Sequence, residues 1–147
     1  MTEDTVSIEA ATPTDLDRVE RLLAANDLPT ADVHDDAPQF YLARLDGAVV
    51  GVGGLELHGD AGLLRSVVVA EPHRRRGYGA TICDGLEARA SRAGVGTLYL
   101  LTTTAADYFR ERGYDPVARS AVPAAVRSTR QFGTLCPDSA TCLRTRL

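Results

Sequence analysis

The feature that most restricts the fold of this chain is an Asp46-Gly47 pair between two apolar runs. Asp-Gly suits the two-residue turns whose backbone twist matches that of antiparallel strands, so Phe40–Leu45 and Ala48–Val52 are predicted to form a hairpin. A second turn is predicted at His58–Gly62, and Leu63–Val69 is predicted to be a third strand. The middle of the chain is therefore expected to be an antiparallel meander.

The pattern changes after Arg74. Gly77–Ala93 has apolar residues at helical spacing, Thr97–Thr102 is expected to be a strand, and Thr104–Arg112 is expected to be a short helix capped by Thr104 and Asp107. A strand–helix–strand segment of this kind needs a right-handed crossover and a parallel strand pair. The other expected elements are a first strand at Val6–Ala10, a helix opened by Thr12 and Pro13, a short helix and loop over Asn26–Pro38, a weak helix over Ala121–Thr129 and a last strand over Thr141–Leu147.

The bulk composition restricts the class of protein. At 147 residues, with 44% apolar and 24% charged residues, the chain is expected to be a soluble globular domain. A net charge of −4 disfavours a general binder of nucleic acid or membrane surfaces. The chain shows neither a signal-peptide pattern nor an apolar run that could cross a membrane, so a cytoplasmic protein is expected. Three cysteines, an odd number, argue against a disulfide framework.

The stretch Arg74-Arg75-Arg76-Gly77-Tyr78-Gly79 lies between the third expected strand and the long helix. Its glycines let the backbone come close to a ligand, and the free N–H groups of a first helical turn favour an anion. The stretch is therefore predicted to bind a pyrophosphate. It is neither a Walker loop nor the dinucleotide fingerprint. The alternatives are a tight turn that requires glycine and arginines that are only solvated.

The segment Leu64–Val69 followed by Arg74-x-x-Gly77-x-Gly79 resembles the acetyl-CoA-binding segment of the GNAT superfamily of N-acetyltransferases. Leu98–Tyr114 resembles the strand and helix that complete the cofactor cleft of that family, and the likeness covers about Val6 to Arg119. It implies an α/β (α+β) GNAT fold as a single domain over residues 1–147. Such a fold has a mixed sheet of about six to seven strands, an antiparallel N-terminal meander, a parallel strand pair around the acetyl-CoA cleft and about four flanking helices.

Two narrower likenesses concern the acceptor. Leu101–Thr104 with Tyr108–Tyr114 resembles the acetyltransferase domain of N-acetylglutamate synthases. The second likeness is to the arsenic-resistance N-acetyltransferase subgroup, and it rests on Leu63–Val69 together with Pro123–Val126, Gln131-Phe132 and Leu135–Ala140. These likenesses imply acetyl transfer to the amine of a small molecule, an amino acid or an amino-acid-like toxin. Two alternatives stay open, namely acetylation of a protein amine and a catalytically weak module that senses acetyl-CoA.

The same resemblance assigns residues to the co-substrate acetyl-CoA, and it implies no metal. Val67 and Val69 would offer backbone groups to the pantetheine arm and the acetyl carbonyl. Thr102 stands where many relatives carry an asparagine that bonds the pantetheine; the alternative is that its hydroxyl caps the next turn. The full expected set is Val67, Val68, Val69, Arg74, Arg75, Arg76, Gly77, Tyr78, Gly79, Ala80, Thr102 and Phe109.

Acyl transfer to an amine needs a group that takes the amine proton, and the leaving thiolate can be helped by an acid. Glu56 and His58 are the candidate bases because they alternate onto one face of a strand, although that face could simply be exposed to solvent. In this family the general-acid tyrosine lies four residues before the glycine that ends the last helix of the segment. That glycine is Gly113 here, so the position is occupied by Phe109. Tyr108 is the neighbouring candidate, turned about 100° round the helix, so the usual acid is absent or displaced.

Arg65 and Thr103 are the expected substrate-binding residues. Strand alternation places Arg65 on the face of Val67, where its guanidinium could bind a substrate carboxylate, unless it lies at the surface. The acidic loop Asp32–Asp36 could meet the ammonium group or could simply be solvated. The predicted partner is thus a small-molecule amine, with neither nucleic acid nor membrane, and the oligomeric state, monomer or homodimer, stays open.

Cys136 and Cys142 lie near the end of the chain. Two thiols can bind a soft ion such as trivalent arsenic, whereas the alternative is that both are small residues that pack the C-terminal segment.

Overall fold

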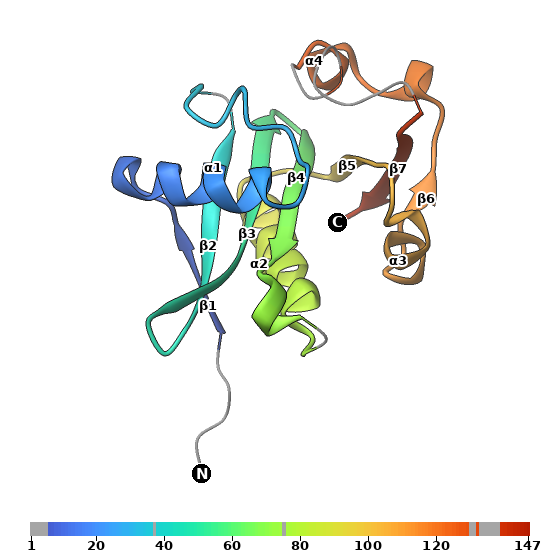
Figure 1. The fold of residues 1–147 in the computed structure, drawn as a ribbon. Helices are drawn as coiled ribbons and strands as arrows, with labels where there is room; N and C mark the ends of the chain where they lie inside the picture. Colours follow the sequence, from blue (N-terminus) through green and yellow to red (C-terminus); the bar gives the residue numbers. More distant parts are fainter. Residues whose placement is uncertain (1–5, 37, 75, 130–131, 133–138) are drawn as a thin grey trace.

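A computed structural model describes residues 6–147 except 37, 75, 130–131 and 133–138. At its centre is a mixed seven-stranded sheet in the order β1-β2-β3-β4-β5-β7-β6 (Figure 1). The strands are β1 (Val6–Ala10), β2 (Gln39–Leu45), β3 (Ala48–His58), β4 (Ala61–Val69), β5 (Thr97–Thr102), β6 (Asp115–Pro116) and β7 (Thr141–Arg146). The helices are α1 (Leu16–Ala24), α2 (Tyr78–Arg92), α3 (Ala106–Glu111) and α4 (Ala124–Arg127), with short 3-10 helices at Pro13–Asp15, Glu71–His73 and Arg119–Ala121.

The hairpin of β2 and β3 has the turn that its sequence predicted. Asp46 has φ 51° and Gly47 has φ 85°, the left-handed pair that a primed turn requires. Strands β1 to β4 pair antiparallel in chain order, which confirms the meander. The following turn is shorter than expected, because only Gly59 and Asp60 separate β3 from β4.

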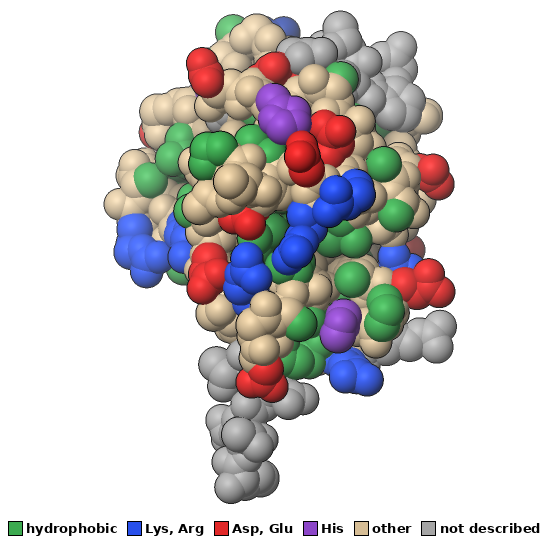
Figure 2. Space-filling model, turned by 60° about the vertical axis from the view of Figure 1, so that its left-hand side comes forward, with side chains coloured by type: hydrophobic (Ala, Val, Ile, Leu, Met, Phe, Trp, Pro, Cys, Tyr) green, Lys and Arg blue, Asp and Glu red, His purple; other side chains and the backbone are tan. Residues whose placement is uncertain are grey.

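Helices cover both faces of the sheet (Figure 1). On one face α2 buries Ile82, Leu86 and Ala90 against strand residues. On the other face α1 buries Val19 and Leu23 against apolar side chains of β2, β3 and β4. Basic and acidic side chains are interspersed over the face shown in Figure 2. None of the described helices is long and apolar enough to cross a membrane.

The parallel pair of β4 and β5 is confirmed, but it is short. Its register joins Ala61–Leu63 to Thr97–Tyr99 and continues no further among the described residues. On its other side β5 pairs with β7 along the whole stretch from Thr97 to Thr102. The facing edges of β4 and β5 thus separate after three residues, while β5 stays paired with β7.

Four local features differ from the predictions. Residues 26–36 form turns and irregular chain, so the expected loop is present but the short helix expected with it is not. Helix α3 begins at Ala106, and the expected Thr104–Asp107 cap pair is replaced by the Thr102 hydroxyl, which accepts the N–H of Ala105 at 3.0 Å. Strand β6 was not predicted, because two residues that include a proline carry no strand pattern. The region of the weak helix divides into a 3-10 helix and α4.

Candidate functional site

A cleft of about 810 Å³ lies where β4 and β5 separate. One side is the second half of β4, and the facing side is the end of β5 with the start of α3. Residues 26–31, which follow α1, form a further part of the lining, here called the acceptor-side wall. Main-chain groups on the separated strand edges therefore border the cleft, and a long ligand can lie between them.

A β-bulge interrupts β4 at this point. Its pairing with β3 jumps from Arg65 opposite Gly54 to Val68 opposite Val52, and Ser66 has φ 57°. The extra residue reverses the alternation of side chains. Arg65 consequently lies against Phe40 on the α1 face, with its guanidinium carbon 5.5 Å from the ring centroid, whereas Val67 packs with the α2 cluster. The prediction that Arg65 and Val67 share a face was wrong for this reason.

The glycine loop leads directly into α2. Gly77 precedes the helix with φ 81°, a conformation that favours glycine, and the first helical hydrogen bond runs from the Thr81 N–H to the Gly77 carbonyl at 3.2 Å. The earlier N–H groups of the helix, those of Tyr78, Gly79 and Ala80, have no carbonyl one turn back. Gly79 lines the cleft, so this array of donors begins at the cleft.

The side chains of the loop have different surroundings. Arg74 is exposed and lines the cleft, and its Nε donates to the Val69 carbonyl at 3.0 Å while Nη2 bonds to the Asn26 side chain. Arg76 is exposed, and Arg75 lies outside the described residues. The Tyr78 ring is buried, and its hydroxyl finds no hydrogen-bond partner in the described part of the chain. Arg74 thus ties the acceptor-side wall to the end of β4.

Thr102 and Thr103 both line the cleft. The Thr102 hydroxyl accepts N–H bonds from Ala105 and Thr104, so the capping alternative is confirmed. Thr103 is exposed at the cleft mouth.

The two neighbouring aromatic residues of α3 both reach the cleft. Phe109 is buried and packs edge-to-face on Tyr114, with ring centroids 5.4 Å apart. Tyr108 is 40% exposed, and its hydroxyl oxygen would lie 3.8 Å from a Cβ placed on Gly79. Loss of solvation raises the pKa of Tyr108, so its hydroxyl stays protonated at neutral pH. The Tyr108 hydroxyl therefore lies beside the glycine loop.

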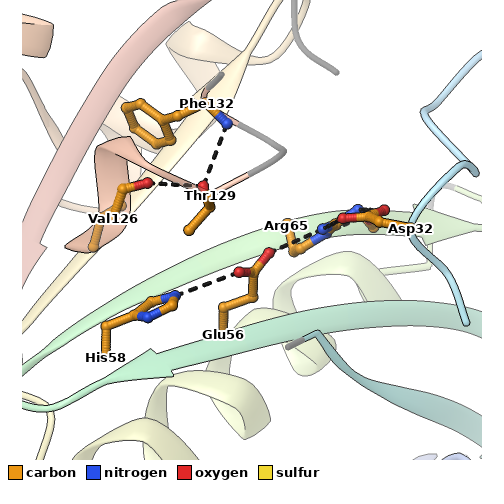
Figure 3. Close-up of polar contacts among 8 residues, drawn as sticks. Asp32, Glu56, His58, Arg65, Val126, Thr129 and Phe132 are labelled. Carbon is orange, nitrogen blue, oxygen red and sulfur yellow. Dashed lines mark hydrogen bonds and ion pairs between the residues drawn. The ribbon is translucent and has the colours of Figure 1, made fainter. Parts of the chain in front are cut away.

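Four titratable side chains form a connected row beside the bulge (Figure 3). Arg65 binds the Asp32 carboxylate with both Nη atoms, one of them at 2.8 Å, and its Nη1 also donates to Glu56 Oε2 at 3.0 Å. The other Glu56 oxygen lies 3.4 Å from His58 Nε2. Burial alone lowers the pKa of Arg65, but the bonds and charges of Asp32 and Glu56 outweigh that effect and raise it.

This row changes the interpretation of three predicted residues. Arg65 and Glu56 are almost fully buried, so neither lies on an exposed face, while 21% of the His58 side chain is exposed. Arg65 lines the cleft, but within the described residues the lining does not include Glu56 or His58. The row was missed because Asp32 and Arg65 are 33 residues apart, and their pairing left no local pattern.

The cysteines give no paired site in the described part of the chain. Cys136 lies outside the described residues, and Cys142 is buried opposite Leu101 of β5, in the hydrophobic cluster that includes Val126 of α4. Among the described residues, no group of three or more His, Cys, Asp or Glu side chains could hold a metal ion.

The family of this chain follows from a comparison with known families. Residues 4–114 match the model of the acetyltransferase (GNAT) family. The chain belongs to this family. The GNAT match includes β1 to β5 and α1 to α3, and so every element that lines the cleft except the stretch around Ala140.

The curated relatives of this GNAT chain bear the name amino-acid acetyltransferase. The protein from Azotobacter vinelandii is 37% identical over 89 residues, which are 59% of this chain and 21% of that protein. The protein from Pseudomonas paraeruginosa is 34% identical over 96 residues, 64% of this chain and 22% of that protein. The chain thus matches about a fifth of the length of these relatives.

Solved structures show the same GNAT fold. N-acetylglutamate synthase from Neisseria gonorrhoeae, complexed with coenzyme A and N-acetyl-glutamate, has a TM-score of 0.81 at 21% identity, over 99% of this chain and 36% of that one. Rv2747 from Mycobacterium tuberculosis, in complex with CoA and NLQ, has a TM-score of 0.79 at 22% identity, over 96% and 99% of the two chains. At these identities the likeness establishes the fold, and the predicted GNAT architecture is confirmed.

Proposed function

We propose that this chain is an N-acetyltransferase that moves the acetyl group of acetyl-CoA to the amine of an amino acid. The observation that carries the proposal is the cleft between the separated strands, which has the N–H array of α2 at Gly79. Its family and the names of its curated relatives support the reaction and the acceptor class.

The residues present fit acetyl-CoA as a co-substrate. The free N–H groups of Tyr78, Gly79 and Ala80, together with the dipole of a 15-residue helix, suit a pyrophosphate. Gly79 leaves the approach open, because even a Cβ there would meet other atoms only at 3.7 Å. The separated edges of β4 and β5 offer main-chain groups to an amide-bearing arm such as pantetheine.

We infer that the acetyl carbonyl binds near the bulge of β4, where the pairing of this strand is interrupted. There the amine nitrogen attacks the carbonyl carbon, the carbon–sulfur bond breaks, and the sulfur leaves with the electron pair as thiolate. Backbone N–H groups at the bulge would donate to the developing oxyanion, and holding both substrates in one cleft would supply much of the acceleration.

The proton lost by the amine needs an acceptor. Glu56 and His58 remain the proposed bases, but neither lines the cleft among the described residues, so the proton has to pass through water. His58 is the end of the buried row that reaches solvent. Tyr108, the candidate for the general acid, lies beside the glycine loop. The thiolate of coenzyme A can also leave with little help from an acid.

Four further properties of this chain are predicted and need tests of their own. They are a single catalytic domain over residues 1–147, a cytoplasmic location, a monomer or homodimer, and membership of the arsenic-resistance subgroup.

The test is release of coenzyme A from acetyl-CoA with each of the twenty amino acids, with their decarboxylated amines and with peptides that carry a free N-terminus or a lysine. We expect turnover with at least one amino acid and an N-acetylated product by mass spectrometry. Binding of acetyl-CoA without transfer to any amine would instead support the sensor alternative. Transfer only to peptide amines would support the protein-acetylating one.

A further inference from the structure

The acceptor-side wall, residues 26–31, lines the cleft without belonging to a helix or strand. Its shape therefore depends on how it is attached. At its start, the Asn26 side chain bonds to Arg74. At its end, Val33 is buried in the α1 core and Asp32 binds Arg65.

The Asp32–Arg65 contact is the strongest of these attachments. It is bidentate, the Arg65 side chain has no exposed surface, and that of Asp32 is 3% exposed. Bidentate charge-assisted bonds of this kind fix the orientation of both groups as well as their distance. The same guanidinium also donates from Nε to the Ser66 hydroxyl at 3.1 Å.

Ser66 is the bulge residue with positive φ, and it lies three residues beyond Leu63, the last residue of β4 that pairs with β5. One buried guanidinium thus connects the acceptor-side wall, through Asp32, to the bulge, through Ser66. Neither Asp32 nor Glu56 lines the cleft among the described residues, but Asp32 directly follows the last residue of the wall, whereas Glu56 binds the same guanidinium from β3. Of the two carboxylates that bind Arg65, that of Asp32 therefore attaches the wall and that of Glu56 does not.

We propose that Asp32 is a specificity-determining positioning residue: through Arg65 it holds the acceptor-side wall at a set distance from the β4 bulge and so sets which amines fit. The proposal deepens the proposed function, on which it rests. It assigns Arg65 an internal carboxylate in place of a substrate carboxylate. Acetyl-CoA binding, which depends on the glycine loop, is separate from this contact.

The test compares Asp32→Asn with Glu56→Gln and with Asp36→Asn. Asp36 is an exposed carboxylate of the same loop and is the matched control. Hydrogen–deuterium exchange of residues 26–31 needs no substrate, and we expect it to rise about tenfold or more in Asp32→Asn and in neither of the other two variants. For the amino acid with the fastest turnover in the panel above, KM should rise about ten- to a hundredfold in Asp32→Asn, with the KM for acetyl-CoA nearly unchanged.

Three results would overturn the proposal. One is equal exchange of residues 26–31 in Asp32→Asn and Glu56→Gln, which would show that the contact is only part of a general core. The other is faster exchange of the wall with no change in the acceptor KM or in the order of preferred amines. The third is exchange of residues 26–31 that is no faster in Asp32→Asn than in the wild-type chain, because Asp32 would then not hold the wall. If the wild-type chain transferred no acetyl group at all, the proposed function itself would fail, and the exchange measurement would still test the attachment.

Discussion

At the glycine-loop end of the cleft the main-chain amides at the start of α2 lie beside the exposed side chains of Arg74 and Tyr108, whereas beside the bulge the polar groups are the buried side chains of Asp32, Arg65 and Glu56. The first end is built by neighbours in the sequence, since Gly77 and Gly79 stand at the start of the helix whose amides they leave open. The second end is built by residues from a loop and two strands. The first arrangement suits a constant group such as a pyrophosphate, and the second can vary with the acceptor.

The largest expected effect is on stability, from Arg65→Ala. Removing the guanidinium leaves two buried carboxylates without their cation, and breaking a buried pair in this way costs about 3–5 kcal/mol. We expect chemical denaturation to show a loss of this size. Because the acceptor-side wall loses the same attachment as in Asp32→Asn, we also expect the KM of amine acceptors to rise whether or not they carry a carboxylate. The control is Arg92→Ala, an exposed arginine of α2, which should change little.

The result that would restore the original prediction for Arg65 is a selective one. If Arg65→Ala kept its stability and lost activity only toward acceptors with a carboxylate, compared with their decarboxylated analogues, then Arg65 would bind the substrate. The two ends of the cleft would then both bind substrate directly.

The next effect is on acetyl-CoA binding, from Gly79→Leu. The Cβ itself fits, with its nearest atoms at 3.7 and 3.8 Å, but a leucine side chain would cover the amides at the start of α2. Loss of two hydrogen bonds to a charged group corresponds to about a hundredfold or more in affinity. Calorimetry measures it, with Ala88→Leu on the exposed side of α2 as the control. Unchanged affinity in Gly79→Leu would show that the pyrophosphate binds elsewhere.

The sequence predicted the glycine-loop end well and the other end poorly. Helix α2, strand β5 and the parallel pair follow from periodicity and from the glycines, which act locally. The bulge at Ser66 has no such signal, because a serine with φ 57° is not marked by composition, and it reversed the predicted face of Arg65. The partner Asp32 was noticed only as part of an acidic loop, since a contact between residues so far apart cannot be derived from spacing.

A smaller effect is expected from Tyr108→Phe. The Tyr108 hydroxyl lies beside Gly79, and its raised pKa keeps it a neutral hydrogen-bond donor. We expect kcat to fall less than about tenfold, below the hundredfold that removal of an acid–base group causes. Steady-state kinetics at saturating acetyl-CoA measure this. A drop of a hundredfold or more would make Tyr108 the general acid and would give the glycine-loop end a side-chain role.

The smallest effect concerns Cys83, which lies on α2 under the same end of the cleft. Burial raises the pKa of Cys83 to about 12, so at pH 8 only about one thiol in ten thousand is ionised. Because the thiolate is the reactive form, iodoacetamide at pH 8 should leave Cys83 unmodified in the folded chain and label it after denaturation. Mass spectrometry of the Cys83 peptide checks this. Fast labelling of the folded chain would mean that the start of α2 opens readily.

The most direct test of the account is a crossed measurement of two Michaelis constants. Gly79→Leu and Asp32→Asn are each assayed for the KM of acetyl-CoA and the KM of the best amino-acid acceptor. The account predicts that Gly79→Leu raises the first and leaves the second within about twofold, and that Asp32→Asn does the reverse. If each variant raised both Michaelis constants equally, the claim that the two ends of the cleft act separately on the two substrates would be wrong.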